Sequence, residues 1–167
     1  LPGADWGRAV AHAGLGVTFI GISLLMAWQV EDIRVAQVGD RLQIAGYDVT
    51  LQDVAEVQGP NYVSTTATML VERAGRRVGV LHPEKRVYPV QAMPTTEAAI
   101  SSGVFRDIYL VIGDRQQGGG WAIRSYVKPF AAWIWVGCGL MALGGLLSLT
   151  DRRYRVAATA RRRASAP

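Results

Sequence analysis

Between Arg8 and Glu31 the chain reads AVAHAGLGVTFIGISLLMAWQV (residues 9–30), a stretch that contains no Asp, Glu, Lys or Arg. A helix over this stretch is about 33 Å long at about 1.5 Å of rise per residue, enough to cross a hydrocarbon core of about 30 Å. A second charge-free stretch, residues 129–150, lies between Lys128 and Asp151. The two stretches predict two transmembrane helices, with a separate domain between them.

The segment between the two apolar stretches has the pattern of β-strands. Short runs rich in Val, Ile, Thr and Tyr alternate with turn residues. The expected strands are residues 41–44, 47–57, 64–72, 77–81, 86–90, 106–112 and 121–127, and the expected breakers include Ala45-Gly46, Gly59-Pro60-Asn61, Ala74-Gly75 and Gly118-Gly119-Gly120. Strands of this number and length favour a small antiparallel barrel that is closed or nearly closed, with a β-sandwich as the alternative.

One segment of this domain reads differently. Residues 95–100 (TTEAAI) begin with a threonine that can cap a helix and continue with good helix formers. This pattern predicts a helical turn inside an irregular connection.

The sequence therefore divides into four segments. They are a lead with the first transmembrane helix (residues 1–30), an external β domain (31–128), the second transmembrane helix (129–150) and a basic tail (151–167). The net charge is +5, and six arginines lie in the tail. Because Lys and Arg near the ends of a span mark the cytoplasmic side, we expect both termini to be cytoplasmic and the β domain to lie on the other side. A basic cluster beside a span is typical of membrane topology and argues against nucleic-acid binding.

The residue inventory also limits the chemistry. Cys138 is the single cysteine, so the sequence has no disulfide framework and no cysteine-based metal pair. The sequence contains no phosphate-binding loop, no nucleophile with a base at useful spacing and no carboxylate pair with separate roles. We therefore assign no catalytic residue. The first apolar stretch lacks the features of a signal peptide, and we interpret the chain as the end of a longer protein.

His12 is the unusual residue of the first span. An ionisable side chain inside a membrane is costly and normally faces protein, a cavity or a cofactor. Gly16 lies on the same helix face, and Ala9 and Ala13 are also small, so a planar group or another helix can approach the backbone. Three interpretations stay open from the residues alone: a haem iron ligand, a proton-relay or helix-packing histidine, and an ordinary interface histidine.

A polar cluster follows the other histidine, His82. The run Glu84-Lys85-Arg86, together with Glu97, predicts ordinary surface salt bridges. The alternative for these side chains is contact with a propionate, a peptide or a partner domain. No role is assigned to His82.

An ordered series of motifs resembles a known family. The motifs are AHAG (residues 11–14), DVAEVQGPN (53–61), EKR (84–86), TTEAAI (95–100), RDIY (106–109) and YVKPF (126–130) followed by Trp133-Ile134-Trp135. Together they resemble the C-terminal part of the CcmF/CycK/NrfE family, the large subunit of the cytochrome c maturation haem lyase. The resemblance covers nearly the whole chain.

The resemblance implies a multi-pass bacterial inner-membrane protein with a periplasmic β domain. Members of the family receive haem from a haem chaperone and help to attach it to apocytochrome c together with other maturation subunits. They also carry a transmembrane haem b that is thought to take electrons from quinol. Its second histidine ligand matches His12 here, which makes His12 the expected metal ligand and His12 and Gly16 the expected cofactor-binding residues.

The chain lacks several parts that the family has. These are the tryptophan-rich external segment, the paired external histidines and the other transmembrane histidine, so the second haem ligand must come from outside this chain. We therefore expect the chain to be inactive as an enzyme alone, and to require the remaining helices of the full-length protein. The alternative is a cofactor-free, membrane-anchored scaffold that binds only protein.

Overall fold

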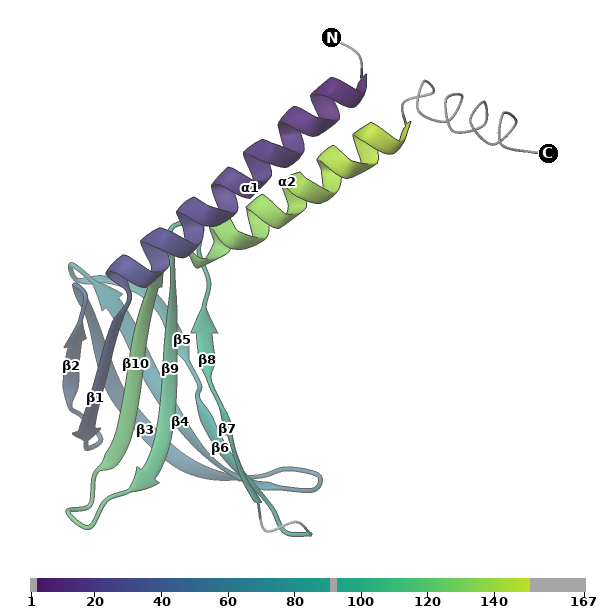
Figure 1. Ribbon diagram of the computed structural model, residues 1–167. Coiled ribbons are helices and arrows are strands. Elements are labelled where there is room, and N and C mark those ends of the chain that lie inside the picture. Colours follow the sequence, from purple (N-terminus) through teal and green to yellow (C-terminus); the bar gives the residue numbers. More distant parts are fainter. Residues whose placement is uncertain (1–2, 91–92, 151–167) are drawn as a thin grey trace. The chain divides into compact units, whose positions relative to one another are not determined.

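The computed structural model describes residues 3–90 and 93–150 and separates the chain into two units. The helices α1 (Gly3–Trp28) and α2 (Ala131–Thr150) belong to one unit, and the strands between them form the other, which extends over Leu25–Pro129 (Figure 1). The basic tail expected over residues 151–167 lies outside the described residues.

Both helices are long and apolar enough to cross a membrane. Asp5 lies in the first turn of α1, where the partial positive charge of a helix N-terminus favours a carboxylate. At the start of α2, Phe130 has a φ of 57°, which ends the extended conformation of the preceding strand. The carbonyl of Phe130 then accepts a hydrogen bond from the Trp133 N–H at 3.0 Å, which closes the first turn.

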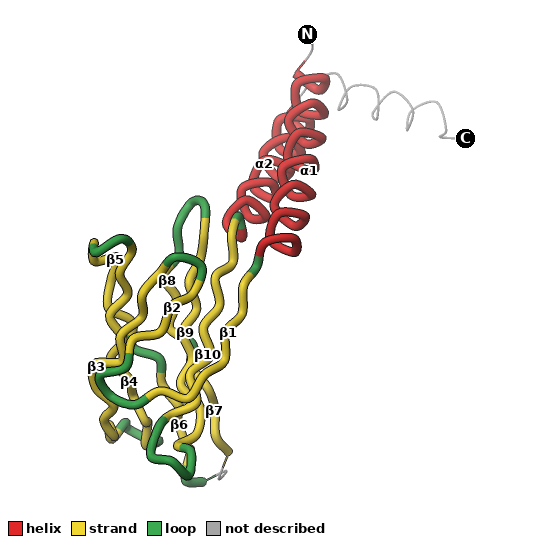
Figure 2. The backbone as a smooth tube through the Cα atoms, turned by 90° about the vertical axis from the view of Figure 1, so that its left-hand side faces the viewer, coloured by secondary structure: helices red, strands yellow, loops and turns green. Residues whose placement is uncertain are grey.

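The two helices pack against each other through glycine. Gly7, Gly14 and Gly21 recur every seven residues on α1, and Gly137 and Gly144 are also seven residues apart on α2. A Cβ added to Gly14 would lie 2.7 Å from the Gly137 carbonyl oxygen, and one added to Gly144 would lie 2.5 Å from the Gly7 carbonyl oxygen. The backbones are therefore in contact along the pair, which lies side by side in Figure 2. Close backbone approach of this kind favours helix association in lipid, where apolar side chains gain little from burial.

The strands of the β domain form two antiparallel sheets. The first has the order β1-β10-β9-β8, and the second has the order β2-β3-β4-β6-β7, with β5 also paired to β4. The first sheet contains β1 (Val30–Ala36), β8 (Ala99–Ser101), β9 (Arg106–Arg115) and β10 (Trp121–Pro129). The second contains β2 (Arg41–Ile44), β3 (Tyr47–Gln58), β4 (Val63–Arg73), β5 (Arg76–Leu81), β6 (Glu84–Tyr88) and β7 (Met93–Glu97).

The core of the domain lies between the two sheets and follows the period-two alternation of the sequence. Val49 and Leu51 of β3 pack with Met69 of β4, and Ile108 and Leu110 of β9 close the core from the other sheet. All five are at most 1% exposed. The residues between them in sequence face outward, as expected for an antiparallel sheet with one buried face.

Two of the predicted turns have the backbone geometry that their sequence requires. Ala45-Gly46 and Ala74-Gly75 both have positive φ at both positions, with values of 47°, 79°, 50° and 75° in chain order. Two successive residues with positive φ are typical of the tight turn that matches the twist of a β-hairpin. These turns fix the register of β2 with β3 and of β4 with β5.

An antiparallel β domain flanked by two apolar helices is confirmed, but the expected barrel closure is not present. In the described chain β1 pairs only with β10 and β2 only with β3, so the alternative of two sheets in a sandwich is the observed architecture. The turn between β1 and β2 explains the break. The Gly39 N–H donates to the Leu51 carbonyl at 2.7 Å and the Gln37 N–H donates to the Asp40 carboxylate at 2.8 Å, so the chain crosses to the second sheet there.

The sequence analysis missed three strands, β1, β7 and β8, and the helical turn predicted over residues 95–100 is wrong. Thr95 pairs with Arg86 in β7, and Ala99 pairs with Leu110 in β8. Threonine is β-branched and fits a pleated sheet well, so cross-strand pairing outweighs its capping preference. β1 carries three charged residues, Glu31, Asp32 and Arg34, which hide its strand character from a pattern search.

Candidate functional site

His12 makes a directed hydrogen bond within α1. Its Nδ1 lies 2.8 Å from the carbonyl oxygen of Arg8, one turn earlier in the helix. A carbonyl oxygen only accepts, so Nδ1 carries the proton and donates. Nε2 is then left with its lone pair, which is the form in which imidazole binds a metal. A hydrogen bond from the other ring nitrogen is also the usual way in which a metal-binding histidine is oriented.

His12 lies on the face of α1 that points away from α2. Gly14, two residues on, contacts α2 and is buried, whereas His12 is exposed. Two residues correspond to roughly 160° around a helix when measured the shorter way. The glycine contacts and the imidazole therefore use opposite sides of α1, and α2 does not cover the ring.

Gly16 shares the His12 face. The two residues are about 40° apart around the helix. No atom lies within 4 Å of a Cβ placed on Gly16, and Ala9 and Ala13 are exposed. The helix surface beside the imidazole consequently carries small residues, so a flat group or another helix can approach the backbone.

The chain has two histidines, and the structure places them in different units. His82 is exposed in the β domain, and its Nδ1 lies 3.4 Å from the Thr68 hydroxyl oxygen. Over residues 3–90 and 93–150, no group of three or more His, Cys, Asp or Glu side chains is arranged to hold a metal ion. His12 is thus a single-residue candidate, which is what one axial position of a haem requires.

The polar cluster after His82 forms salt bridges, as the sequence predicts. Arg86 Nε lies 2.9 Å from the Glu84 carboxylate, and a second Arg86 nitrogen lies 3.6 Å from the Glu97 carboxylate. The guanidinium also lies 4.7 Å from the centre of the Tyr62 ring. The hydrogen bond to Glu84 raises the pKa of Arg86 above its ordinary value, with a further contribution from Tyr88, so this cation is fixed and charged. We interpret this group as a structural clamp between β6, β7 and the connection that leads into β4.

Lys85 does not join that clamp, although it lies between Glu84 and Arg86 in sequence. Its side chain points to the opposite face of β6 and forms an ion pair with Asp114 of β9, in the other sheet. Sequence spacing did not reveal Asp114 or Tyr62 as partners. Asp114 lies on β9 and Tyr62 lies in the connection between β3 and β4, so both partners are distant in sequence and no local signal could have found them.

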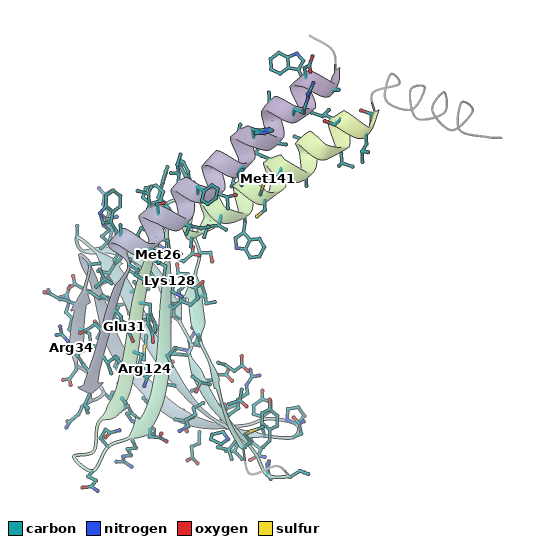
Figure 3. All side chains as sticks on the ribbon, viewed as in Figure 1. Met26, Glu31, Arg34, Arg124, Lys128 and Met141 are labelled. Carbon is teal, nitrogen blue, oxygen red and sulfur yellow. The ribbon has the colours of Figure 1, made fainter. Side chains whose placement is uncertain are left out.

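A second cationic position lies on the outer face of the first sheet. Lys128 Nζ is 4.4 Å from the centre of the Tyr109 ring and 5.7 Å from that of Tyr126. Figure 3 shows Lys128 and Arg124 projecting from β10, next to Glu31 on β1. Cations held over aromatic rings are stabilised by the ring quadrupole. This contact ties β9 to β10 just before the chain enters α2.

Comparison with known proteins decides the family. A family model described as the CcmF C-terminal beta-sandwich matches residues 27–129. This range covers the whole β domain and more than half of the chain. The chain belongs to the CcmF family. The resemblance carried by the ordered motifs is confirmed.

Curated members of the CcmF family are similar over nearly the entire chain. The cytochrome c-type biogenesis protein ccl1 of Rhodobacter capsulatus is 67% identical over 162 residues, which cover 97% of this chain and 25% of that protein. CcmF of Escherichia coli is 47% identical over 151 residues, covering 90% of this chain and 23% of its own length. CycK of Bradyrhizobium diazoefficiens is 44% identical over 158 residues, covering 95% and 24%. The chain therefore spans about a quarter of the length of these relatives.

A solved structure of the family has the same fold. The protein titled Cytochrome c Heme Lyase CcmF superposes with a TM-score of 0.69 over 86% of this chain and 24% of that chain, at 23% sequence identity. This likeness supports the arrangement of helices and strands described above.

Proposed function

We propose that the chain is the C-terminal portion of a cytochrome c maturation haem lyase and that His12 supplies one axial ligand of a transmembrane haem b. The names of its relatives support a role in cytochrome c biogenesis. The hydrogen bond from His12 Nδ1 to the Arg8 carbonyl carries the assignment, because it leaves Nε2 free on a helix face that α2 does not cover.

The residues present fit such a group. Nε2 of His12 would hold the iron, and Gly16 would give the ring of the porphyrin room beside the helix. When bound, haem b supplies one-electron transfer, here from quinol towards the iron of the haem that is to be attached. The Arg8 carbonyl holds the proton on Nδ1 and keeps the imidazole oriented. The second axial ligand comes from a helix outside this chain.

The proposal includes a place in the cell. We infer an inner-membrane protein in which α1 and α2 both cross the bilayer. The six arginines of residues 151–167 favour cytoplasmic termini and therefore a periplasmic β domain. A reporter fused after residue 167 should then behave as cytoplasmic, and one inserted at Gly119 should behave as periplasmic.

The β domain is proposed to serve as a docking module. Other maturation subunits, the haem chaperone and apocytochrome c are the partners that this role implies, and the remaining helices of the full-length protein pack against α1 and α2. The open glycines support this last point. Apart from the backbone of their own helix, no atom of the described residues lies within 4 Å of a Cβ added to Gly16, Gly139 or Gly145, so these positions leave helix surface for neighbours.

The test is a reduced-minus-oxidised visible spectrum of the complete membrane complex at constant protein level. Replacement of His12 by alanine should remove most of the b-type signal and reduce cytochrome c maturation in parallel. His82→Ala is the matched control, because it removes the other imidazole from an exposed site in the β domain. It should leave the b-type spectrum unchanged.

The opposite result would favour the scaffold alternative. If His12→Ala leaves the b-type spectrum and maturation intact, His12 is not a haem ligand and the chain acts through protein docking alone. His12→Met keeps a ligand that iron accepts, so a shifted b-type signal in that variant would separate lost ligation from misfolding.

A further inference from the structure

A cleft opens between the two sheets of the β domain. It has a volume of about 390 Å³, which falls within the range of small-molecule sites. One wall comes from β4, β6 and β7, and the other from the end of β9 and the start of β10.

Lys85 stands inside this cleft at a position that alternation would assign to the core. It pairs with Thr65 across β4 and β6, and Val87, two residues on, faces the same way. Only 18% of the Lys85 side chain is exposed. A lysine side chain that is buried to this extent is stabilised by an anionic or hydrogen-bonding partner for its ammonium group, because desolvation of an unpaired charge is costly.

The partner of Lys85 is much more exposed to solvent than Lys85 itself. Asp114 is 77% exposed and reaches Lys85 from the rim of the cleft. A second cation lines the same cleft, where the Arg115 guanidinium lies 6.0 Å from the centre of the Trp121 ring. Both Arg115 and Trp121 line the cleft. The cleft thus contains two cations and one carboxylate, and that carboxylate is far more exposed than the Lys85 side chain with which it is paired.

The rest of the lining is mixed. Val87, Pro94 and Trp121 supply apolar surface, and Thr65 and Gly113 complete the cleft. The ligand that matches this lining has a carboxylate at one end, for Lys85, and a flat or apolar body that rests against the indole. Such chemistry occurs both in the propionate of a porphyrin and in the carboxylate of an aromatic peptide.

We propose that this cleft binds a carboxylate carried on an aromatic or apolar body, with Lys85 as its anchor. In the free protein Asp114 forms an ion pair with Lys85, and the carboxylate of the ligand replaces Asp114 in that pair. Arg115 adds a second favourable charge, and Trp121 provides the stacking surface. This proposal does not rest on haem ligation by His12, which lies in the other structural unit.

The experiment follows Trp121 in the full chain in detergent by fluorine NMR of 5-fluorotryptophan. The Trp121→Phe variant assigns the signal among the five tryptophans. Titration with 3-phenylpropionate should shift the Trp121 resonance, and titration with the neutral 3-phenylpropanamide should not. Equal shifts from the acid and the amide would overturn the proposal.

Two variants at the ion pair should act in opposite directions. Lys85→Met should abolish the response to 3-phenylpropionate. Asp114→Asn should tighten its binding about fivefold, because the competing carboxylate is gone while the ammonium group remains. Asp53→Asn is the matched control, since it removes the same charge from an exposed residue outside the cleft, and it should change nothing.

A gain of affinity in Asp114→Asn cannot result from misfolding, so this variant keeps the test decisive. If Asp114→Asn only lowers the stability of the domain and leaves the affinity unchanged or weaker, the ion pair is merely a tie between the sheets and the proposal fails. Competition experiments then distinguish the two possible sources of the bound carboxylate. Displacement by protoporphyrin IX but not by its dimethyl ester assigns a porphyrin propionate, and displacement by N-acetylphenylalanine but not by its amide assigns a peptide carboxylate.

Discussion

The helix pair and the β domain are held together by different means. In the described parts of the helices the buried positions are glycines and one alanine, Ala4, and large side chains such as Phe19, Trp135 and Leu149 are exposed. In the β domain the buried positions are large aliphatic residues such as Leu110 and Met69. One unit is joined by backbone contact and the other by side chains that fill a core.

This difference is the one expected if the helices lie in lipid and the β domain lies in water, as proposed above. In water, burial of an apolar side chain stabilises the fold by roughly 25 cal/mol per Å². In lipid the same burial gains little, because the hydrocarbon chains are as apolar as leucine. Close approach of two backbones then becomes the main source of specificity. The two units should consequently respond in opposite ways to added and removed methyl groups.

The largest effect is expected where a side chain is added between the helices. Gly144→Leu places a Cβ 2.5 Å from the Gly7 carbonyl oxygen, which is shorter than any real contact, so the helices must separate. The nuclear Overhauser contacts between Ala11 and residue 144 should disappear in detergent. We expect complete loss of this helix pairing.

The adjacent glycine provides the control. A Cβ on Gly145 meets no atom within 4 Å, so Gly145→Leu should keep the Ala11–Gly144 contacts. Equal loss of contacts in the two variants would mean that helix propensity or lipid exposure, and not close packing, governs the pair.

A smaller effect is expected where a side chain is removed from the β domain. Leu110 is fully buried, and Leu110→Ala should lower the free energy of unfolding by about 2–5 kcal/mol because it leaves a cavity. Urea unfolding followed by tryptophan fluorescence measures this change. Val90→Ala, at a residue that is 98% exposed, should change it by less than about 0.5 kcal/mol. Similar losses in both variants would show that the core is not tightly packed.

The smallest effect concerns pH and the surface of the β domain. The hydrogen bond from Arg41, at 2.7 Å, lowers the pKa of Asp48 below its usual value, and a hydrogen bond from Gln43 acts in the same direction while partial burial opposes them. Because the folded-state pKa is depressed, the stabilisation by Asp48 is complete above the pKa of the unfolded state, about 3.9. It is lost as the pH falls through the folded-state pKa.

A comparison of wild type with Asp48→Asn checks this prediction. The difference in the free energy of unfolding between the two proteins should be constant near neutral pH and should shrink below about pH 4. High salt should reduce the difference at neutral pH, because Arg41 is about half exposed. A difference that grows as the pH falls would contradict the assignment.

Much of the fold could be predicted from the sequence because the signals are local. The two charge-free stretches are long and apolar enough to indicate two helices, and the glycines of the Ala-Gly turns readily accept the positive φ that a tight hairpin turn requires. Local sequence does not decide between a barrel and a sandwich. The choice depends on the turn at Gln37 to Asp40 and on edge strands such as β1, whose pairing with β10 joins residues about ninety positions apart.

The candidate sites also divide into features that the local sequence predicts and features that depend on the three-dimensional structure. His12 could be found from sequence because a lone ionisable residue in an apolar stretch is conspicuous. The orientation of its ring towards the Arg8 carbonyl needed the structure. The pair of Lys85 with Asp114 could not be predicted, since it joins two sheets, and the neighbouring charges of Glu84 and Arg86 made Lys85 look like one more surface residue.

The pairing of β1 with β10 also shortens the link between the helices. The chain leaves α1 into β1 and returns from β10 into α2, and Val30 and Val127 are cross-strand partners. Neighbouring strands are about 4.8 Å apart, so about a hundred residues of polypeptide act as a tether only a few residues long. Once the β domain has folded, α2 meets α1 at the high effective concentration of a short helical hairpin, and the entropy of closing so long a loop no longer opposes their association.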